Sequence, residues 1–184
     1  MNTPIIFIQG AGEGAYAADQ KLADSLQRNL GEAYTVIYPR MPHEDQPDYT
    51  AWKNQIAVEM EALETAVILV GHSFGGSLLL KYLAEQRPPV ALRALVLIAT
   101  PYWGAADWEV EEYALPQDFG AQLPDVPVYL YHGTDDEIVP FEHLACYAQH
   151  LPGAVKREVA GRDHQLNDDL SEVAADIQRL AANE

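Results

Sequence analysis

The sequence predicts an α/β fold, a doubly wound and mostly parallel six-stranded sheet with helices on both faces. Short apolar, β-branched segments alternate with amphipathic helical stretches along the whole chain, which is typical of a parallel sheet. Several of the strand segments are apolar throughout, as expected for strands that helices cover on both sides. A chain of 184 residues, 48 % of them hydrophobic, suffices for one core, so we expect a single domain over residues 1–184.

Six segments have the strand pattern and five have the helix pattern. The expected strands are residues 5–8, 35–38, 67–70, 94–98, 128–131 and 156–159. The expected helices are residues 17–29, 49–63, 75–86, 142–149 and 169–181, the last of which Asn167, Asp168 or Asp169 can cap. In an open parallel sheet the ligand crevice lies at the carboxyl ends of the strands. We therefore expect functional residues in the loops that follow the strands.

The charge and composition narrow the range of partners. A formal net charge of −17 repels the phosphates of nucleic acids and anionic lipids, so the expected partner is a small molecule, with neither nucleic acid nor membrane. The longest apolar runs are strand-sized, well short of the ~20 residues of a membrane helix. The start of the sequence has no export signal, and the single cysteine, Cys146, excludes an internal disulfide. We expect a cytoplasmic location.

A serine lies between two glycines where the third expected strand gives way to a helix. The sequence there reads Gly71-His72-Ser73-Phe74-Gly75. A turn this abrupt leaves no room for side chains two residues before and after the serine, so glycine is needed at both places. The turn also raises the serine hydroxyl above the sheet, beside free N–H groups at the start of the helix. The pattern predicts that Ser73 is a nucleophile.

Two later loops carry residues that can activate this serine. Serine needs a histidine base, which a carboxylate must orient, and in strand-turn-helix folds these partners follow in the order serine, acid, histidine. Asp135 and Asp136 follow the fifth expected strand, and the residues alone do not separate them. His164 follows the last expected strand with a glycine nearby, and we predict that it is the base. The other histidines, which have less suitable positions, are His43, His72, His132, His143 and His150.

Over nearly its whole length the chain resembles the α/β-hydrolase superfamily, and in particular its small members that begin at the third strand of the full fold and have almost no lid. The acid loop of that family commonly reads His-Gly-x-x-Asp-x-x-Val-Pro, which residues 132–140 match, and the resemblance implies that Asp136 is the acid. The backbone N–H of Phe74 is one expected oxyanion donor. The family's His-Gly-x motif after the first strand implies Ala11 as the other, although Gln9 replaces the histidine.

The loop after the first strand is also compatible with a dinucleotide-binding motif. Gly10, Gly12 and Ala15 fit Gly-x-Gly-x-x-Gly/Ala. The acidic residue expected after the second strand is missing, but Arg40 stands there and suits a 2′-phosphate. This alternative does not account for the serine turn, the acid loop and the histidine loop together. We expect no cofactor and no metal, because no His, Cys or carboxylate cluster has metal-ligand spacing.

Residues 100–127 are the only stretch long enough to act as a lid. Several aromatic residues within it either form a wall for an apolar acyl or alcohol group or anchor the loop to the sheet. We expect Tyr102 and Trp103 to bind substrate, with Met41 on the opposite side. The predicted function is hydrolysis of a carboxylic ester or a related acyl bond of a small substrate through an acyl-enzyme. The alternatives are an acyltransferase of the same fold and a binding protein that retains the triad without catalysis.

Overall fold

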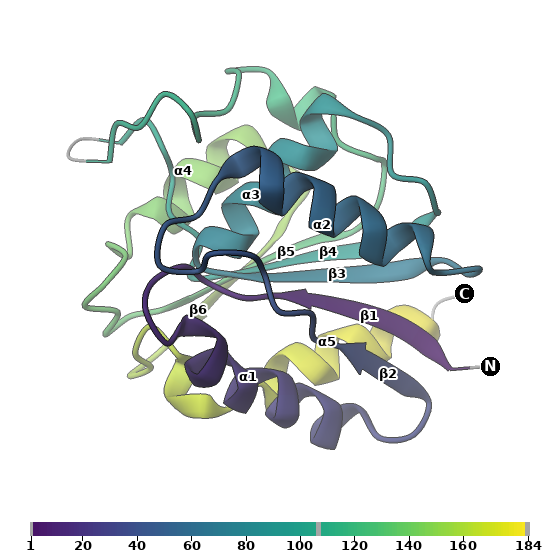
Figure 1. Cartoon of the computed structure of the whole chain (residues 1–184). Coiled ribbons are helices and arrows are strands. Elements are labelled where there is room, and N and C mark those ends of the chain that lie inside the picture. The colour runs from purple at the N-terminus through teal and green to yellow at the C-terminus, as the bar shows by residue number, and fades with distance from the viewer. Residues whose placement is uncertain (1, 106–107, 183–184) are drawn as a thin grey trace.

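The computed structural model describes residues 2–105 and 108–182, which form one six-stranded parallel sheet with the strand order β2-β1-β3-β4-β5-β6 (Figure 1). Every strand that the sequence predicted is present. The strands are β1 (Thr3–Ile8), β2 (Tyr34–Ile37), β3 (Val67–His72), β4 (Leu92–Ile98), β5 (Val128–Gly133) and β6 (Val155–Val159). β3 runs two residues beyond its predicted end because Gly71 and His72 still pair with Leu97 and Ile98 of β4.

Helices cover both faces of the sheet, as predicted (Figure 1). One face carries α1 (Ala15–Leu30) and α5 (Ser171–Ala182); the other carries α2 (Tyr49–Glu61), α3 (Phe74–Glu85) and α4 (His143–His150). A separate hydrophobic cluster fills the space between the sheet and each helical layer. α5 begins two residues later than predicted, because residues 166–168 have left-handed φ values and the Asp169 carboxylate accepts the Ser171 N–H.

The strand order places a switch point between β1 and β3. β1 pairs with β2 on one side and with β3 on the other. The connection after β1 therefore runs to β2 on one side, whereas the connection after β3 runs to β4 on the opposite side. The loops after β1 and β3 therefore diverge at the carboxyl edge of the sheet, where open α/β sheets bind ligands. The loop after β1 contains Gly10 and Ala11, and the turn after β3 contains Ser73.

The predicted lid segment is a loop with one short 3₁₀ turn, Phe119–Ala121, in its described part. Phe119 is completely buried against the α4 side of the molecule, where its ring meets those of Tyr147 and His150. Residues 106 and 107 of this segment lie outside the described residues. Among the described residues, no helix combines the length and the apolar character that crossing a membrane requires.

Candidate active site

Ser73 occupies a strained turn at the carboxyl end of β3. Its φ and ψ are 51° and −126°, in a region that residues other than glycine rarely adopt. The Ser73 N–H donates to the carbonyl of Ile98 at 2.8 Å, which ties the turn to β4. Strain of this kind is typical of a nucleophile turn that lifts a serine hydroxyl above the sheet.

Close backbone packing explains the two glycines that flank the serine. A Cβ on Gly75 would lie 2.3 Å from the carbonyl oxygen of Gln9, and one on Gly71 would lie 2.5 Å from the Cα of Gly76. Neither distance is compatible with a side chain. The turn thus lets α3 begin directly against the loop that follows β1, and even a Cβ on Gly10 would lie only 3.2 Å from Ser73 Cβ.

The structure brings His164 and Asp136 together. His164 Nδ1 lies 2.8 Å from Asp136 Oδ2, and the Asp136 side chain is fully buried while that of His164 is 14 % exposed. Burial raises the pKa of Asp136, but hydrogen bonds from His132 and His164 and from the Val139 N–H outweigh it and hold that pKa well below its usual range. Asp136 is therefore a carboxylate that can orient a histidine.

The neighbouring Asp135 takes no part in this contact. Its side chain is exposed and accepts a hydrogen bond from the Thr134 hydroxyl at 2.9 Å. His132 bonds locally, with Nε2 3.0 Å from both the Val139 carbonyl and Asp136 Oδ2. The acid loop thus presents one of its two adjacent carboxylates to His164.

The Ser73 hydroxyl is free in this structure. Within residues 2–105 and 108–182, neither this hydroxyl nor His164 Nε2 has a hydrogen-bond partner. Because His164 Nδ1 donates to Asp136, Nε2 carries the lone pair that can accept a proton. Bonds between a nucleophile and its base are often loose without substrate and tighten when it binds.

The backbone N–H groups of the loop after β1 include both bonded and free donors among the described residues. The Gly10 N–H donates to Asp19 Oδ2 at 2.7 Å, and the Gly12 N–H donates to the Glu44 carbonyl at 2.6 Å. Among the described residues, the N–H groups of Ala11 and Phe74 have no acceptor. Ala11 and Phe74 are the two positions at which the sequence predicted oxyanion donors.

A second buried histidine–aspartate contact, which the sequence analysis missed, lies behind the nucleophile turn. His72 Nδ1 is 2.8 Å from Asp19 Oδ2, and both side chains are 1 % exposed. A signal was available: Asp19 lies on the inward face of α1, where Leu22, Ala23 and Leu26 are buried and an apolar residue is expected. A charge on that face indicates a buried polar partner.

Of the three predicted substrate-binding residues, Trp103 packs against the nucleophile turn through the ring of Phe74. Its ring is 6.1 Å from that of Phe74, centroid to centroid. Tyr102 packs against α4, with its hydroxyl 2.9 Å from His150 Nε2. Met41 is 2 % exposed and belongs to the hydrophobic core. Substrate contact by these residues remains a prediction.

The dinucleotide alternative meets a structural obstacle. The Glu44 carboxylate accepts the Tyr16 N–H at 2.7 Å, so an anion already occupies the start of α1, where a pyrophosphate would bind. The guanidinium of Arg40 stacks on the Tyr16 ring, 4.3 Å from its centroid. Within the part of the chain that the structure describes, no group of three or more His, Cys, Asp or Glu side chains can hold a metal ion.

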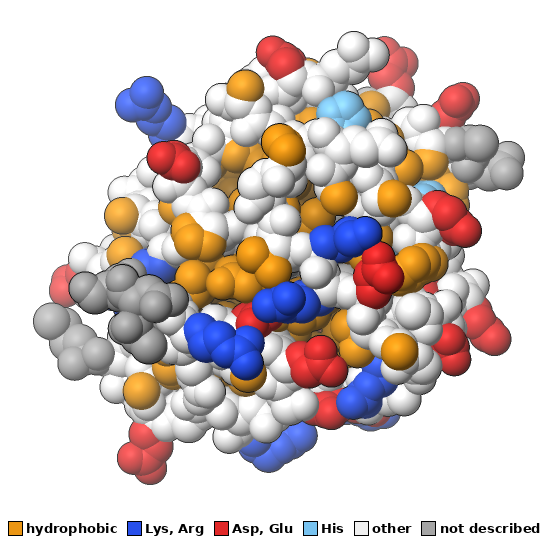
Figure 2. All heavy atoms as spheres, turned by 180° about the vertical axis from the view of Figure 1, so that it is seen from behind, with side chains coloured by type: hydrophobic (Ala, Val, Ile, Leu, Met, Phe, Trp, Pro, Cys, Tyr) orange, Lys and Arg blue, Asp and Glu red, His pale blue; other side chains and the backbone are white. Residues whose placement is uncertain are grey.

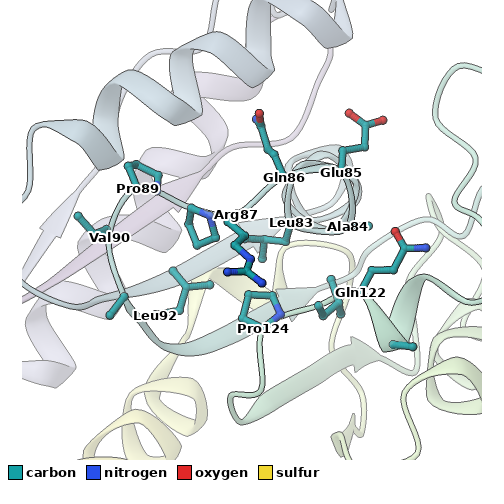
Figure 3. Close-up of a pocket in the computed structure, with 14 residues that line it drawn as sticks. Leu83, Ala84, Glu85, Gln86, Arg87, Pro89, Val90, Leu92, Gln122 and Pro124 are labelled. Atoms are coloured by element: carbon teal, nitrogen blue, oxygen red, sulfur yellow. The ribbon is translucent and has the colours of Figure 1, made fainter.

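A hollow between α3 and β4 is remote from this site. It measures about 740 Å³ and lies between the end of α3, the start of β4 and residues 121–124 (Figure 3). The start of β4 lies at the amino ends of the strands, whereas Ser73 follows the carboxyl end of β3. A smaller hollow of about 460 Å³ adjoins His164 and is lined by Asp135, Glu137, Ile138, Asp163 and Gln165 among others.

The sequence and the structure match known hydrolases. A serine hydrolase involved in carbazole degradation is 16 % identical with a TM-score of 0.76, and the match covers 100 % of this chain and 92 % of that one. A meta-cleavage product hydrolase from Pseudomonas fluorescens is 17 % identical with a TM-score of 0.76, covering 99 % and 91 %. The esterase domain of a Rhodothermus marinus protein is 18 % identical with a TM-score of 0.64, covering 97 % and 84 %.

These likenesses show a shared fold, the α/β-hydrolase fold. A search among curated proteins found no match. The family model described as serine hydrolase matches residues 18–169, which is most of the chain. The protein is therefore an enzyme of the α/β-hydrolase fold and belongs to the serine hydrolase family.

Proposed function

We propose that the enzyme hydrolyses a carboxylic ester or a related acyl bond of a small substrate through the triad Ser73, His164 and Asp136. The observation that carries this proposal is the 2.8 Å contact between His164 Nδ1 and a fully buried Asp136, in a chain whose Ser73 has the φ of a nucleophile turn. An exposed surface serine needs neither the strain nor the oriented histidine.

The reaction proceeds in two steps through an acyl-enzyme. Ser73 Oγ attacks the carbonyl carbon while its proton passes to His164 Nε2, and the oxyanion accepts hydrogen bonds from the N–H groups of Phe74 and Ala11. The intermediate collapses, and the leaving group departs with the proton from His164. Water, deprotonated by His164, then attacks the Ser73 ester; the bond to Ser73 Oγ breaks, Ser73 takes the proton back from His164, and the acid is released. Asp136 keeps the Nδ1–H tautomer throughout and stabilises the imidazolium.

The surroundings favour a small substrate. The loop of residues 100–127 is too short to enclose a long chain, and the hollow beside His164 is open and shallow. Trp103, next to Phe74, supplies apolar surface near the nucleophile. Such a site suits short acyl groups or small aromatic ones. We assign the enzyme to the cytoplasm, with neither nucleic acid nor membrane as a partner, on the basis of its charge and single cysteine.

Active-site labelling tests the proposal directly. We expect a fluorophosphonate probe to label the wild type and to leave Ser73→Ala unlabelled, with Ser77→Ala as the control because Ser77 lies in α3 and donates to the Pro101 carbonyl. A chain-length series of p-nitrophenyl esters then defines the acyl preference. A wild type that neither reacts with the probe nor cleaves any ester would refute catalysis by this triad. Product analysis with added alcohols separates hydrolysis from acyl transfer.

A further inference from the structure

The Asp19–His72 contact joins three segments of the active site. Asp19 Oδ2 accepts the Gly10 N–H at 2.7 Å, and Asp19 Oδ1 accepts from Gln165 Nε2 at 3.0 Å. His72 Nε2 lies 3.0 Å from the His164 carbonyl. The pair therefore contacts the oxyanion loop (residues 9–14), the nucleophile turn and the base loop (residues 160–165). None of these contacts belongs to the triad.

The hydrogen-bond partners define the protonation of the pair. Both ring nitrogens of His72 face acceptors, the Asp19 carboxylate and the His164 carbonyl, so both must carry hydrogen. Asp19 receives donors at both oxygens, which leaves no position for a carboxyl proton. The pair is therefore an imidazolium and a carboxylate, buried together, with every donor and acceptor satisfied. A buried ion pair persists under these conditions, whereas one left with a single partner is costly.

The pKa values agree in direction with this geometry. Burial lowers the pKa of His72, but the Asp19 charge and hydrogen bond outweigh it and raise that pKa. Burial raises the pKa of Asp19, but the His72 charge and the bonds from Gly10 and Gln165 lower it overall. The other titratable groups facing the pair are Asp136 and His164 from the loops after β5 and β6, Tyr38 from the end of β2, and Glu44 and Tyr16 beyond it.

We propose that Asp19 and His72 are positioning residues: as an ionised pair, they hold the oxyanion loop and the base loop in register with Ser73. This inference rests on the proposed function. Neither residue touches the reacting atoms. The pair fixes Gly10, next to the Ala11 N–H, and the backbone of His164, whose ring must reach the serine. A displacement of about 1 Å at such positions costs ~100-fold in rate.

Three variants separate the bonds of the pair. Asp19→Asn keeps the volume and removes the charge, so His72 cannot remain an imidazolium. His72→Gln keeps a donor near the position of Nε2, toward the His164 carbonyl, whereas His72→Asn keeps one near Nδ1, toward Asp19. Asp176→Asn is the matched control, because Asp176 is also a buried carboxylate, 4 % exposed, that accepts from Tyr131 and Arg157 away from the site.

We expect kcat for p-nitrophenyl acetate to fall ~10- to 100-fold in Asp19→Asn with little change in KM, because positioning acts on the transition state. His72→Gln should retain more kcat than His72→Asn, since it keeps the bond to the base loop. Hydrogen exchange should rise at residues 9–14 and 160–165 in Asp19→Asn and not in Asp176→Asn. Imidazole ¹⁵N spectra of the wild type should show that His72 stays doubly protonated above pH 6.5, the ordinary histidine pKa, because Asp19 raises its pKa.

The outcomes distinguish this inference from the proposed function. If the wild type is inert to esters and to fluorophosphonate, the proposed function fails. The ¹⁵N spectra still show whether the pair is ionised, and hydrogen exchange still shows whether it holds the two loops. A neutral His72 ring in the wild type would overturn the ionised pair. Unchanged kcat and unchanged exchange in both Asp19→Asn and His72→Asn would overturn the positioning role. Lost stability in Asp19→Asn with exchange raised equally throughout the chain would also overturn it.

Discussion

Two adjacent carboxylates, Asp135 and Asp136, provide a sharp test of the proposed triad at the level of single residues. Asp136→Asn keeps the shape of the side chain but removes the charge that holds His164 in its Nδ1–H tautomer, and we expect kcat to fall ~10³- to 10⁴-fold. Asp135→Asn should leave kcat within about twofold, because the Asp135 side chain is exposed and accepts only from the Thr134 hydroxyl among the described residues. Steady-state kinetics on one ester decides the matter, and equal losses in both variants would exclude Asp136 as the specific partner.

The Asp19–His72 pair also predicts how stability depends on pH. A carboxylate with a lowered pKa stabilises the folded state fully at pH values above 3.8, the ordinary pKa of aspartate. This stabilisation is lost as the pH falls through the folded-state pKa. A histidine with a raised pKa stabilises the folded state fully at pH values below 6.5, the ordinary pKa of histidine. This stabilisation is lost as the pH rises through the folded-state pKa. The difference in free energy of unfolding between wild type and His72→Gln should therefore be largest between these two values.

Urea unfolding at a series of pH values measures this difference. We expect it to decline toward alkaline pH as His72 deprotonates and toward strongly acidic pH as Asp19 protonates. His43→Gln serves as the control, because His43 is exposed and its substitution should change stability little at any pH. A constant difference for His72→Gln across the series would mean that the contact does not depend on charge.

Among the structural elements, the junction of β3 and α3 depends most visibly on backbone contact. Gly75→Ala would place a methyl group 2.3 Å from the Gln9 carbonyl oxygen and 2.5 Å from that of Ile8. Relief requires α3 to move away from β1, so we expect a loss of ~1–3 kcal/mol in unfolding free energy together with a fall in kcat.

Gly153→Ala is the control for the Gly75→Ala prediction, because a Cβ on Gly153 meets nothing within 4 Å. Thermal unfolding and ester hydrolysis are measured on both variants. If Gly75→Ala had the melting temperature and the activity of the wild type, the close approach of α3 to the first loop would be irrelevant to the site.

Some aromatic residues of the lid-like loop anchor it to the molecule, and others pack beside the nucleophile turn. Phe119 is an anchor, fully buried against α4, and Tyr113 bonds through its hydroxyl to the Pro47 carbonyl at 3.3 Å. Trp103 and Tyr113 also pack around the ring of Phe74, at the start of α3. The described part of the loop is therefore fastened to the body of the molecule while it carries apolar surface to the nucleophile.

At the scale of the whole molecule, we expect the net charge of −17 to favour cationic small substrates over anionic ones. Asp and Glu side chains are spread over the rear face, with Lys and Arg among them (Figure 2). Acidic groups also line the hollow beside His164. For esters matched in size, we expect kcat/KM to be higher with a cationic leaving group than with an anionic one. Added salt should reduce the difference, because it screens charges beyond about 10 Å at 0.1 M.

A neutral ester of the same size controls for general effects of salt on the enzyme. Rates are compared at about 0.01 M and 0.5 M sodium chloride, where the screening length changes several-fold. The prediction fails if the anionic ester is preferred at low salt, or if the ratio of the two rates does not respond to salt.

The sequence by itself determined the sheet, its helical layers and the position of the nucleophile. These follow from local signals: apolar strands, amphipathic helices, and glycines that a tight turn requires. It also brought Ser73, the acid loop and His164 to one edge, because the carboxyl ends of parallel strands meet there. The family resemblance, and not the residues alone, favoured Asp136 over Asp135.

Only the tertiary structure decided which groups meet. It directs Asp136 and not Asp135 at His164, leaves the Ala11 N–H without an acceptor among the described residues, and joins Asp19 to His72 and to Gln165, 146 residues away in the sequence. Periodicity reports which face of an element is buried but not what lies opposite a polar group on that face. Such partners come from distant segments, and their hydrogen-bond geometry is set only when the sheet and its loops are assembled.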